Sequence, residues 1–397
     1  MITSDTLARI RAETPGLAHG THMLACGSAL PAQPVLDAVI EFLQFEAEIG
    51  GYEAFAARRE QLDGVYTKVA SHINADPREI ALVENATVAW CQAFYALPMS
   101  PGQRILTCES EYASNYLAFL QRAKRDGVTI EVVPSDKTGA IDLDALDAAM
   151  GPDVAVFAMT WVPTSGGLVN PAAGAGKIAR KHGVPYLLDA CQAVGQLRID
   201  VRDIGCDFLS ATGRKFLRAP RGTGFLYVAQ DRAERLEPAV IDLHSAEWVS
   251  RDAYALKPDA RRFENWENAY ALRAGLGAAL DYADAIGIDA IEARVKDLAD
   301  HARALLTALP GVDVRDLGQE RCGIVSLTTP RGDPDVLARE MADRGFAIGT
   351  SSPSSTRLDF DKRGMPTLIR IAPHYYNTED EIAACISALG NLLHQAA

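Results

Sequence analysis

Two short segments with the pattern of strand ends constrain the fold of this chain more than any other feature. Residues 186–188 are apolar and are followed by Asp189, and residues 207–210 lead into a turn that contains Lys215. Continuous apolar runs of this length are typical of strands buried in a parallel sheet. Because the carboxyl ends of such strands meet at one edge of the sheet, ligands bind there. The sequence therefore predicts an α/β fold that brings an acid and a lysine together at the sheet edge.

An acid and a lysine in this setting suit pyridoxal 5'-phosphate. The lysine holds the cofactor's aldehyde as a Schiff base, and the carboxylate keeps the ring nitrogen protonated. Once substrate displaces the lysine, its amine is a general base. Gln192 is expected to face the phenolic oxygen, and Thr212 and Arg214 to face the phosphate. The alternative is that Asp189 caps a helix and Lys215 is solvated. This alternative would account for either residue alone, but it accounts poorly for the two together in this order.

Residues 187–228, LLDACQAVGQLRIDVRDIGCDFLSATGRKFLRAPRGTGFLYV, resemble the class V aminotransferase group of fold-type I enzymes. That group includes cysteine desulfurases, selenocysteine lyases, isopenicillin N epimerase and hercynylcysteine sulfoxide lyases. The resemblance runs from about residue 20 to the C-terminus. It implies a large domain with a mainly parallel seven-stranded sheet, a small C-terminal α/β domain and a homodimer.

The expected domain boundaries follow from the same resemblance and from helix stops. We expect residues 1–25 to form an N-terminal arm that packs with the small domain. Residues 26–286 should form the large domain that binds pyridoxal phosphate, and residues 287–397 the small domain. Gly287 follows a long helical pattern, as a glycine that ends a helix does.

The resemblance implies further site residues. Ala86 and Thr87 would grip the cofactor phosphate at a helix N-terminus, although a plain helix cap is as common. Tyr112 stands where desulfurases have a histidine that stacks on the cofactor ring. Thr164 lies near the position at which family members often have an asparagine that contacts the oxygen side of the ring. Arg370 matches the strand arginine that binds the substrate carboxylate. A surface position is the alternative for Tyr112 and Arg370.

Two segments depart from the family pattern or stand apart from it. Glu267 lies near the position of a desulfurase threonine that reaches the partner subunit's phosphate, and an acid there would repel the phosphate. Arg262 is a candidate to replace that contact. The segment 48–52 is similar to part of the sulfoxide lyases, or it is a helix stop followed by a packed Tyr52.

Composition excludes several classes of function. The net charge of −13 disfavours a nucleic-acid partner. The N-terminus lacks the basic flank and apolar run of a signal peptide, and no apolar stretch is long enough to span a bilayer. Seven cysteines without a Cys-x-x-Cys pair argue against a disulfide framework or a zinc site. We therefore expect a cytoplasmic enzyme with no metal.

One motif competes with this interpretation. Residues 174–179 match the dinucleotide fingerprint G-x-G-x-x-A, but they lie inside a helical pattern and do not follow a strand. We therefore expect these glycines to serve helix packing. A dinucleotide enzyme remains the last alternative.

The expected reaction is β-elimination at the carbon–sulfur bond of a cysteine-derived amino acid, with Lys215 and Asp189 as catalytic residues and a contribution from Tyr112. Epimerisation or transamination is the alternative, and a non-catalytic cofactor-binding protein is disfavoured because Lys215 is intact. A cysteine desulfurase is also disfavoured, because the corresponding loop, residues 349–356, contains serines and no cysteine. Cys191 is expected to face the core.

Overall fold

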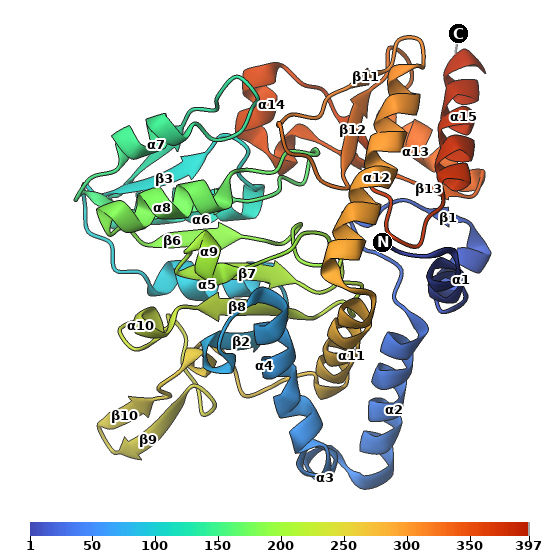
Figure 1. Cartoon of the computed structure of the whole chain (residues 1–397). Helices are drawn as coiled ribbons and strands as arrows, with labels where there is room; N and C mark the ends of the chain where they lie inside the picture. Colours follow the sequence, from blue (N-terminus) through green and yellow to red (C-terminus); the bar gives the residue numbers. More distant parts are fainter. Residues whose placement is uncertain (396–397) are drawn as a thin grey trace.

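A seven-stranded sheet forms the centre of the molecule (Figure 1). The computed structural model describes residues 1–395. The strand order is β2-β8-β7-β6-β5-β3-β4, and only β8 runs antiparallel to the other six strands. The predicted α/β fold with a mainly parallel sheet is confirmed. The strands are β2 (Ile80–Val83), β3 (Arg104–Cys108), β4 (Thr129–Val133), β5 (Val154–Thr160), β6 (Tyr186–Asp189), β7 (Phe208–Thr212) and β8 (Gly224–Val228).

Helices cover both faces of this sheet. Leu187 packs in one apolar cluster with α5 (Ala86–Ala96) and α6 (Ala113–Asp126). The next residue of β6, Leu188, belongs to the cluster on the other face, because successive side chains of a strand point to opposite faces. The helices of that second face include α4 (Arg59–Ile73), α8 (Ala172–His182) and α11 (Tyr270–Ile286). The sheet is thus buried on both faces, which is why its strands are continuously apolar.

A second, four-stranded antiparallel sheet lies in the C-terminal part of the chain, in the order β11-β12-β15-β14. Gly287 separates α11 from α12 (Ile288–Thr307), which packs with this sheet around a separate apolar cluster. The strands are β11 (Asp313–Val314), β12 (Val325–Thr328), β14 (Gly349–Ser351) and β15 (Leu368–Ile371), and the further helices are α13 (Pro334–Asp343), α14 (Arg357–Arg363) and α15 (Glu379–Gln395).

The N-terminal segment joins this C-terminal part. After α1 (Ser4–Ala12), β1 (Thr21–His22) pairs in parallel with β13 (Phe346–Ala347). Arg11 donates to the carbonyl oxygen of Tyr376 at 2.7 Å and forms an ion pair with Glu381 at 2.7 Å. None of the helices within residues 1–395 is long and apolar enough to cross a membrane.

Arg218 ties the central sheet to both ends of the chain. Its side chain is 1% exposed and its backbone has the left-handed φ of 62°, which a non-glycine residue adopts only where the surroundings enforce it. The guanidinium donates to the Leu30 carbonyl oxygen at 2.7 Å, to Thr14 Oγ1 at 2.7 Å and to the Tyr375 hydroxyl at 2.9 Å. These three hydrogen bonds satisfy a buried charge that lies three residues after Lys215.

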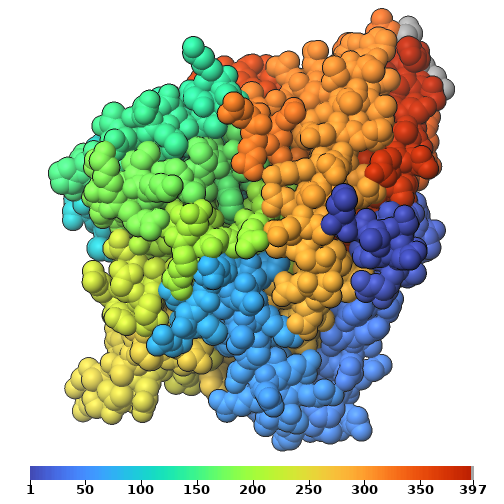
Figure 2. Space-filling view, viewed as in Figure 1, coloured from blue at the N-terminus to red at the C-terminus, as the bar shows by residue number. Residues whose placement is uncertain are grey.

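Two helices and a hairpin extend beyond the sheet. Helix α2 (Gln33–Ile49) ends at Gly50, whose φ is 100°, and α3 (Gly51–Ala57) follows. Tyr52 is 79% exposed in this chain, so the alternative of a packed tyrosine after the helix stop is wrong. The hairpin of β9 (Ala246–Ser250) and β10 (Ala253–Leu256) projects from the molecule at the lower left of Figures 1 and 2.

Candidate active site

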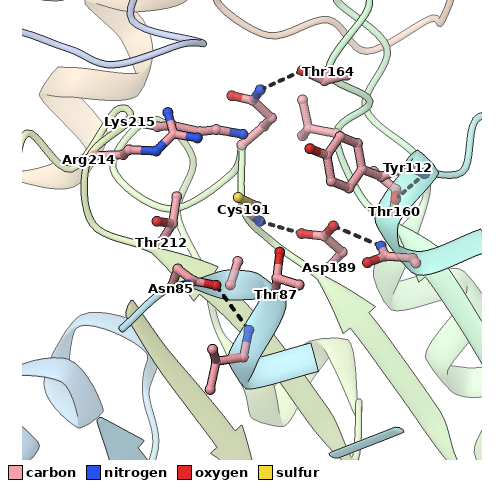
Figure 3. A pocket seen from close by; sticks show the side chains of 15 residues that line it. Asn85, Thr87, Tyr112, Thr160, Thr164, Asp189, Cys191, Thr212, Arg214 and Lys215 are labelled. Carbon is pink, nitrogen blue, oxygen red and sulfur yellow. Dashed lines mark hydrogen bonds between the residues drawn. The ribbon is translucent and has the colours of Figure 1, made fainter. Parts of the chain in front are cut away.

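A cavity of about 500 Å³ opens at the carboxyl ends of the parallel strands. Every residue predicted to bind the cofactor lines it, together with several that were not predicted (Figure 3). The predicted members are Ala86, Thr87, Tyr112, Thr164, Asp189, Gln192, Thr212, Arg214 and Lys215, and the additional ones are Asn85, Val88, Asn115, Thr160, Val162 and Cys191.

Asp189 ends β6 and is almost fully buried at the floor of the cavity. Its Oδ1 accepts a hydrogen bond from the backbone N–H of Cys191 at 2.8 Å, and its Oδ2 accepts one from Asn115 Nδ2 at 3.0 Å. Burial raises the pKa of this carboxyl, while the hydrogen bond from Asn115, the Cys191 N–H and the charge of Lys215 act in the opposite direction. A cation next to Asp189, such as a protonated ring nitrogen, would stabilise the ionised carboxylate.

Behind Asp189 lies a second buried carboxylate, Glu111, which the sequence analysis did not single out. Asn115 Nδ2 donates to Glu111 Oε1 at 2.9 Å as well as to Asp189. Thr160, at the end of β5, lies opposite Asp189 in the strand register and donates its hydroxyl to Glu111. Thr160 could have been predicted from the sequence, because it ends a buried strand and Asp189 was predicted for the same reason.

Lys215 lies in a turn after β7, with its side chain at the cavity and largely buried. Gly195 supports this turn from below: its φ is 89°, and a Cβ there would lie 2.2 Å from the backbone nitrogen of Leu217. A side chain at position 195 would therefore displace the lysine turn. The neighbouring Arg214 donates to the carbonyl oxygen of Gly27 and also lines the cavity.

The phosphate end predicted for the cavity is the N-terminus of α5. Asn85 caps this helix by accepting the N–H of Val88 at 3.0 Å. Among the described residues, the backbone N–H groups of Ala86 and Thr87 have no hydrogen-bond acceptor, so they remain available to an anion. The hydroxyl of Thr212 lies at the same cavity but donates to the Thr223 carbonyl oxygen at 3.3 Å.

Gln192 and Thr164 line the cavity, and hydrogen bonds connect them to Arg370, which is not among the described residues that line it. Gln192 Nε2 donates to Thr164 Oγ1 at 3.1 Å and to the carbonyl oxygen of Cys26 at 3.0 Å. Arg370, on β15, donates to both oxygens of Thr164. The amide oxygen of Gln192 is buried and, within residues 1–395, has no partner. Such an orphaned polar atom indicates that a bound group completes this wall of the cavity.

Tyr112 occupies the N-cap position of α6, and its ring faces the cavity in Figure 3. Cys191 also lines the cavity, so the expectation that it faces the core is wrong. The residue follows Asp189 in a turn, where side chains do not continue the alternation of a strand. Burial raises the pKa of the Cys191 thiol, so the thiol stays protonated.

Arg262 is not available as a substitute phosphate ligand, contrary to expectation. It is 6% exposed, and its guanidinium donates to the carbonyl oxygens of Lys257 at 2.7 Å and Leu236 at 2.9 Å. These backbone acceptors hold the side chain inside the 230–264 segment. Glu267 itself is exposed.

The glycines of the dinucleotide-like motif serve packing. They lie within α8, and a Cβ at Gly176 would lie 1.9 Å from the carbonyl oxygen of Ile204. The motif therefore allows α8 to approach α9 (Val201–Ile204) closely, and it does not form a turn after a strand.

The fold and the cavity together define a fold-type I enzyme that depends on pyridoxal 5'-phosphate. The donor set fits this cofactor, since a lysine, a buried carboxylate and a helix N-terminus line one cavity of suitable chemistry. The chain matches the family model "Aminotransferase class-V" over residues 22–385. It belongs to that family.

Similar proteins agree with this family. A probable cysteine desulfurase of Methanothermobacter thermautotrophicus is 29% identical, with 98% of this chain and 97% of the relative covered. Isopenicillin N epimerase of Streptomyces clavuligerus is 31% identical, with 82% of each chain covered. In structure, the cysteine desulfurase CsdA of Escherichia coli superimposes with a TM-score of 0.91 at 21% identity, covering 98% of this chain and 99% of that one.

Proposed function

We propose that this enzyme is a lyase that cleaves the carbon–sulfur bond of a cysteine-derived amino acid. In the overall reaction, R–S–CH2–CH(NH3+)–COO− and water give the thiol R–SH, pyruvate and ammonium. A sulfoxide conjugate would release a sulfenic acid in place of the thiol. In either case the sulfur leaves on the product, and no sulfur is transferred to the protein.

The side chains at the cavity divide the work. When bound, the cofactor supplies the electron sink for the carbanion at Cα. Lys215 would remove the α-proton, because its side chain lines the cavity and a free lysine amine is a base. Arg370 orients the α-carboxylate, and Asp189 holds the proton on the ring nitrogen. The N-terminus of α5 anchors the phosphate.

The segment 349–356 is the observation that carries the choice of a lyase over a desulfurase. Residues 349–351 form the edge strand β14, paired with β15, and Ser351 Oγ lies 2.9 Å from Ser165 Oγ. Thr356 Oγ1 lies 2.8 Å from the same Ser165 oxygen. The segment therefore presents hydroxyl groups engaged with one another, and an unassisted hydroxyl is a much weaker nucleophile than a thiolate.

The protein's other thiols near this segment in sequence are also unsuited to attack sulfur. Cys322 and Cys385 are fully buried, and burial raises the pKa of each thiol to about 12. Such thiols remain protonated at neutral pH.

Epimerisation of an amino acid is the second candidate, favoured by the 31% identity to isopenicillin N epimerase. It begins with the same α-proton removal by Lys215 and ends with reprotonation on the other face. The test is a screen of cysteine conjugates, cysteine and D- and L-amino acids that follows pyruvate, persulfide, racemisation and keto acids in parallel. Pyruvate with free thiol supports the lyase. Racemisation without pyruvate contradicts it, and so does a persulfide on the protein.

We further propose that the enzyme is a homodimer. Leu36, Ile40 and Leu43 are exposed on one stripe of α2, and Trp248 and Trp266 are exposed in and near the β9–β10 hairpin. Helices α2 and α3 (blue) and the hairpin (yellow) form the lower end of the molecule in Figure 2. Sedimentation of the wild type against Leu36→Asp/Leu43→Asp tests this, and a monomeric wild type would contradict it.

A further inference from the structure

We propose that Glu111 is a positioning residue of the cofactor site, which fixes the Asn115 amide and through it holds Asp189 against the ring nitrogen. The proposal rests on the cofactor, and it applies to elimination and epimerisation alike. Glu111 itself does not line the cavity, and it acts through Asn115 and Asp189, which do.

The carboxylate of Glu111 is saturated with hydrogen-bond donors. Glu111 is only 2% exposed. Oε2 accepts from Thr107 Oγ1 at 2.9 Å. Oε1 accepts from the backbone N–H of Tyr112 at 2.8 Å, from Asn115 Nδ2 at 2.9 Å and from the Thr160 hydroxyl. Four donors on one buried side chain fix its position.

The Asn115 amide is the link between the two carboxylates. An asparagine Nδ2 carries two hydrogens, and here the two acceptors are Glu111 Oε1 at 2.9 Å and Asp189 Oδ2 at 3.0 Å. If the amide turned over, its oxygen would face both carboxylate oxygens, which is repulsive. Glu111 therefore selects the orientation in which Asn115 donates to Asp189.

Glu111 also fixes the start of α6. Tyr112 is the N-cap residue of α6, and its N–H is held by Glu111 Oε1 and, at 3.2 Å, by Thr160 Oγ1. The carboxylate lies at the positive end of the helix dipole, which favours the ionised form. Glu111 therefore holds the backbone of Tyr112 directly and Asp189 through Asn115.

The charges around Glu111 determine what its ionisation does. The titratable groups that face it are Asp189 and Tyr186 on β6 and Cys108 on β3, and among residues 1–395 Glu111 forms no ion pair with a lysine, arginine or histidine. Burial raises the pKa of Glu111 to about 7. A protonated ring nitrogen next to Asp189 would add the missing positive charge, and an ionised Glu111 would in turn make Asp189 a stronger base toward that nitrogen.

The test compares Glu111→Gln with the same substitution at a neighbouring glutamate, Glu109. Glu109 points elsewhere and pairs with Lys362 at 2.6 Å, so Glu109→Gln is the matched control. The measurements on purified protein are the dissociation constant of pyridoxal 5'-phosphate, the pH titration of the bound chromophore's absorbance, and kcat and KM. Glu111→Gln should weaken cofactor binding at least tenfold and move the titration midpoint to lower pH, because a negative charge near the protonated groups is lost. It should lower kcat more than it raises KM.

A double-mutant cycle with Asn115→Ala establishes whether Glu111 acts through Asn115. If it does, Glu111→Gln has less than a twofold further effect on cofactor binding in the Asn115→Ala background, whereas the charge that is lost still moves the titration midpoint. Fully additive effects on cofactor binding overturn the proposal, as does a Glu109→Gln variant with the same shifts as Glu111→Gln. Glu111→Asp keeps the charge and should retain the wild-type midpoint more closely than Glu111→Gln.

Far-UV circular dichroism and thermal unfolding of each apoprotein establish that the variants fold. If Glu111→Gln does not fold, Asn115→Ser carries the test, because it removes the amide and leaves Glu111 in place. An unchanged cofactor affinity and absorbance titration in Asn115→Ser would overturn the proposal. These readouts do not require a substrate, so they are independent of whether the enzyme is a lyase.

Discussion

Arg370 Nη1 donates to both oxygens of Thr164, to the carbonyl oxygen at 2.7 Å and to the hydroxyl at 2.9 Å. This contact joins β15 of the C-terminal sheet to the segment after β5 of the central sheet. The Thr350 carbonyl oxygen accepts from Nε at 3.1 Å. Two of the three guanidinium nitrogens are thus held by the protein, and within residues 1–395 Nη2 has no partner. The arginine is oriented in advance of any ligand.

We predict that Arg370→Lys lowers kcat/KM for amino-acid substrates at least tenfold, or about 1.4 kcal/mol. Lysine keeps the charge but loses the planar fork that binds a carboxylate and holds Thr164. Steady-state kinetics check this, with Arg357→Lys on α14 as the control, since that side chain is 66% exposed. Equal kinetics for Arg370→Lys and the wild type would place Arg370 outside the substrate site.

Asp189→Asn should reduce turnover by two or more orders of magnitude while the protein still folds. The change removes the charge and keeps the shape, and preorganised electrostatic stabilisation is often the largest catalytic contribution. The amide oxygen of the substituted side chain can still accept the hydrogen bond from the Cys191 N–H. Single-turnover kinetics with saturating pyridoxal phosphate provide the measurement, and near-wild-type rates would show that Asp189 does not face the ring.

Borohydride reduction of the yellow holoenzyme should attach the cofactor to Lys215 alone. The lysine is largely buried at the cavity, whereas Lys181 and Lys362, for example, are more than half exposed and form ion pairs. Peptide mapping by mass spectrometry identifies the labelled residue. A label on another lysine, or no chromophore after addition of the cofactor, would contradict the assignment of Lys215.

Replacing Cys191, Cys322 and Cys385 together by alanine should leave conjugate cleavage within about threefold of the wild type, apart from losses of stability. No thiolate takes part in the proposed elimination. Intact-protein mass spectrometry during turnover should detect no persulfide on the wild type. A trapped persulfide, or loss of activity in the triple variant while its fold is intact, would favour a desulfurase.

The apoprotein should lose stability through Glu111 as the pH rises. Burial raises the pKa of this carboxyl from its ordinary 4.5 to about 7, so the folded state keeps a proton that the unfolded chain has released. The contribution is complete below about pH 4.5 and is lost by about pH 7, and it is on the order of 3 kcal/mol.

Unfolding temperatures of the wild type and Glu111→Gln, measured across this range, isolate the effect. The pKa of His374, which burial lowers, affects both proteins equally. The wild type should lose stability relative to the variant between pH 4.5 and pH 7. Parallel curves would show that Glu111 does not titrate in this range.

The sequence predicts the elements whose apolar pattern is continuous. The apolar segment at residues 186–188 and the Asp189 that follows it form β6, and the helix stop expected at Gly287 is found there. Buried parallel strands need apolar side chains on both faces, and this requirement leaves a direct trace in the sequence. The β9–β10 hairpin left no such trace, because four of the five residues of β9 are exposed.

The candidate site was predictable where one residue follows a strand and unpredictable where contacts depend on packing. Asp189 and Lys215 were found from strand ends. Glu111 and Asn115 were not, because an acid and an amide four residues apart at a helix start are also typical of a solvated helix cap. Only the folded structure shows that Asn115 contacts Asp189 and that Glu111 contacts Asn115. The orientation of Cys191 likewise depends on a turn.

Arg218 has a consequence for the order in which the chain matures during synthesis. Its buried guanidinium needs the hydroxyl of Tyr375, which the ribosome makes 157 residues later. Until that tyrosine emerges, a charge three residues from Lys215 lacks one of its three acceptors, and the strained backbone at Arg218 lacks one of the contacts that enforce it. We expect the lysine turn to take its final shape only when the last part of the chain has been translated, so that the cofactor is captured by finished molecules and not by nascent ones.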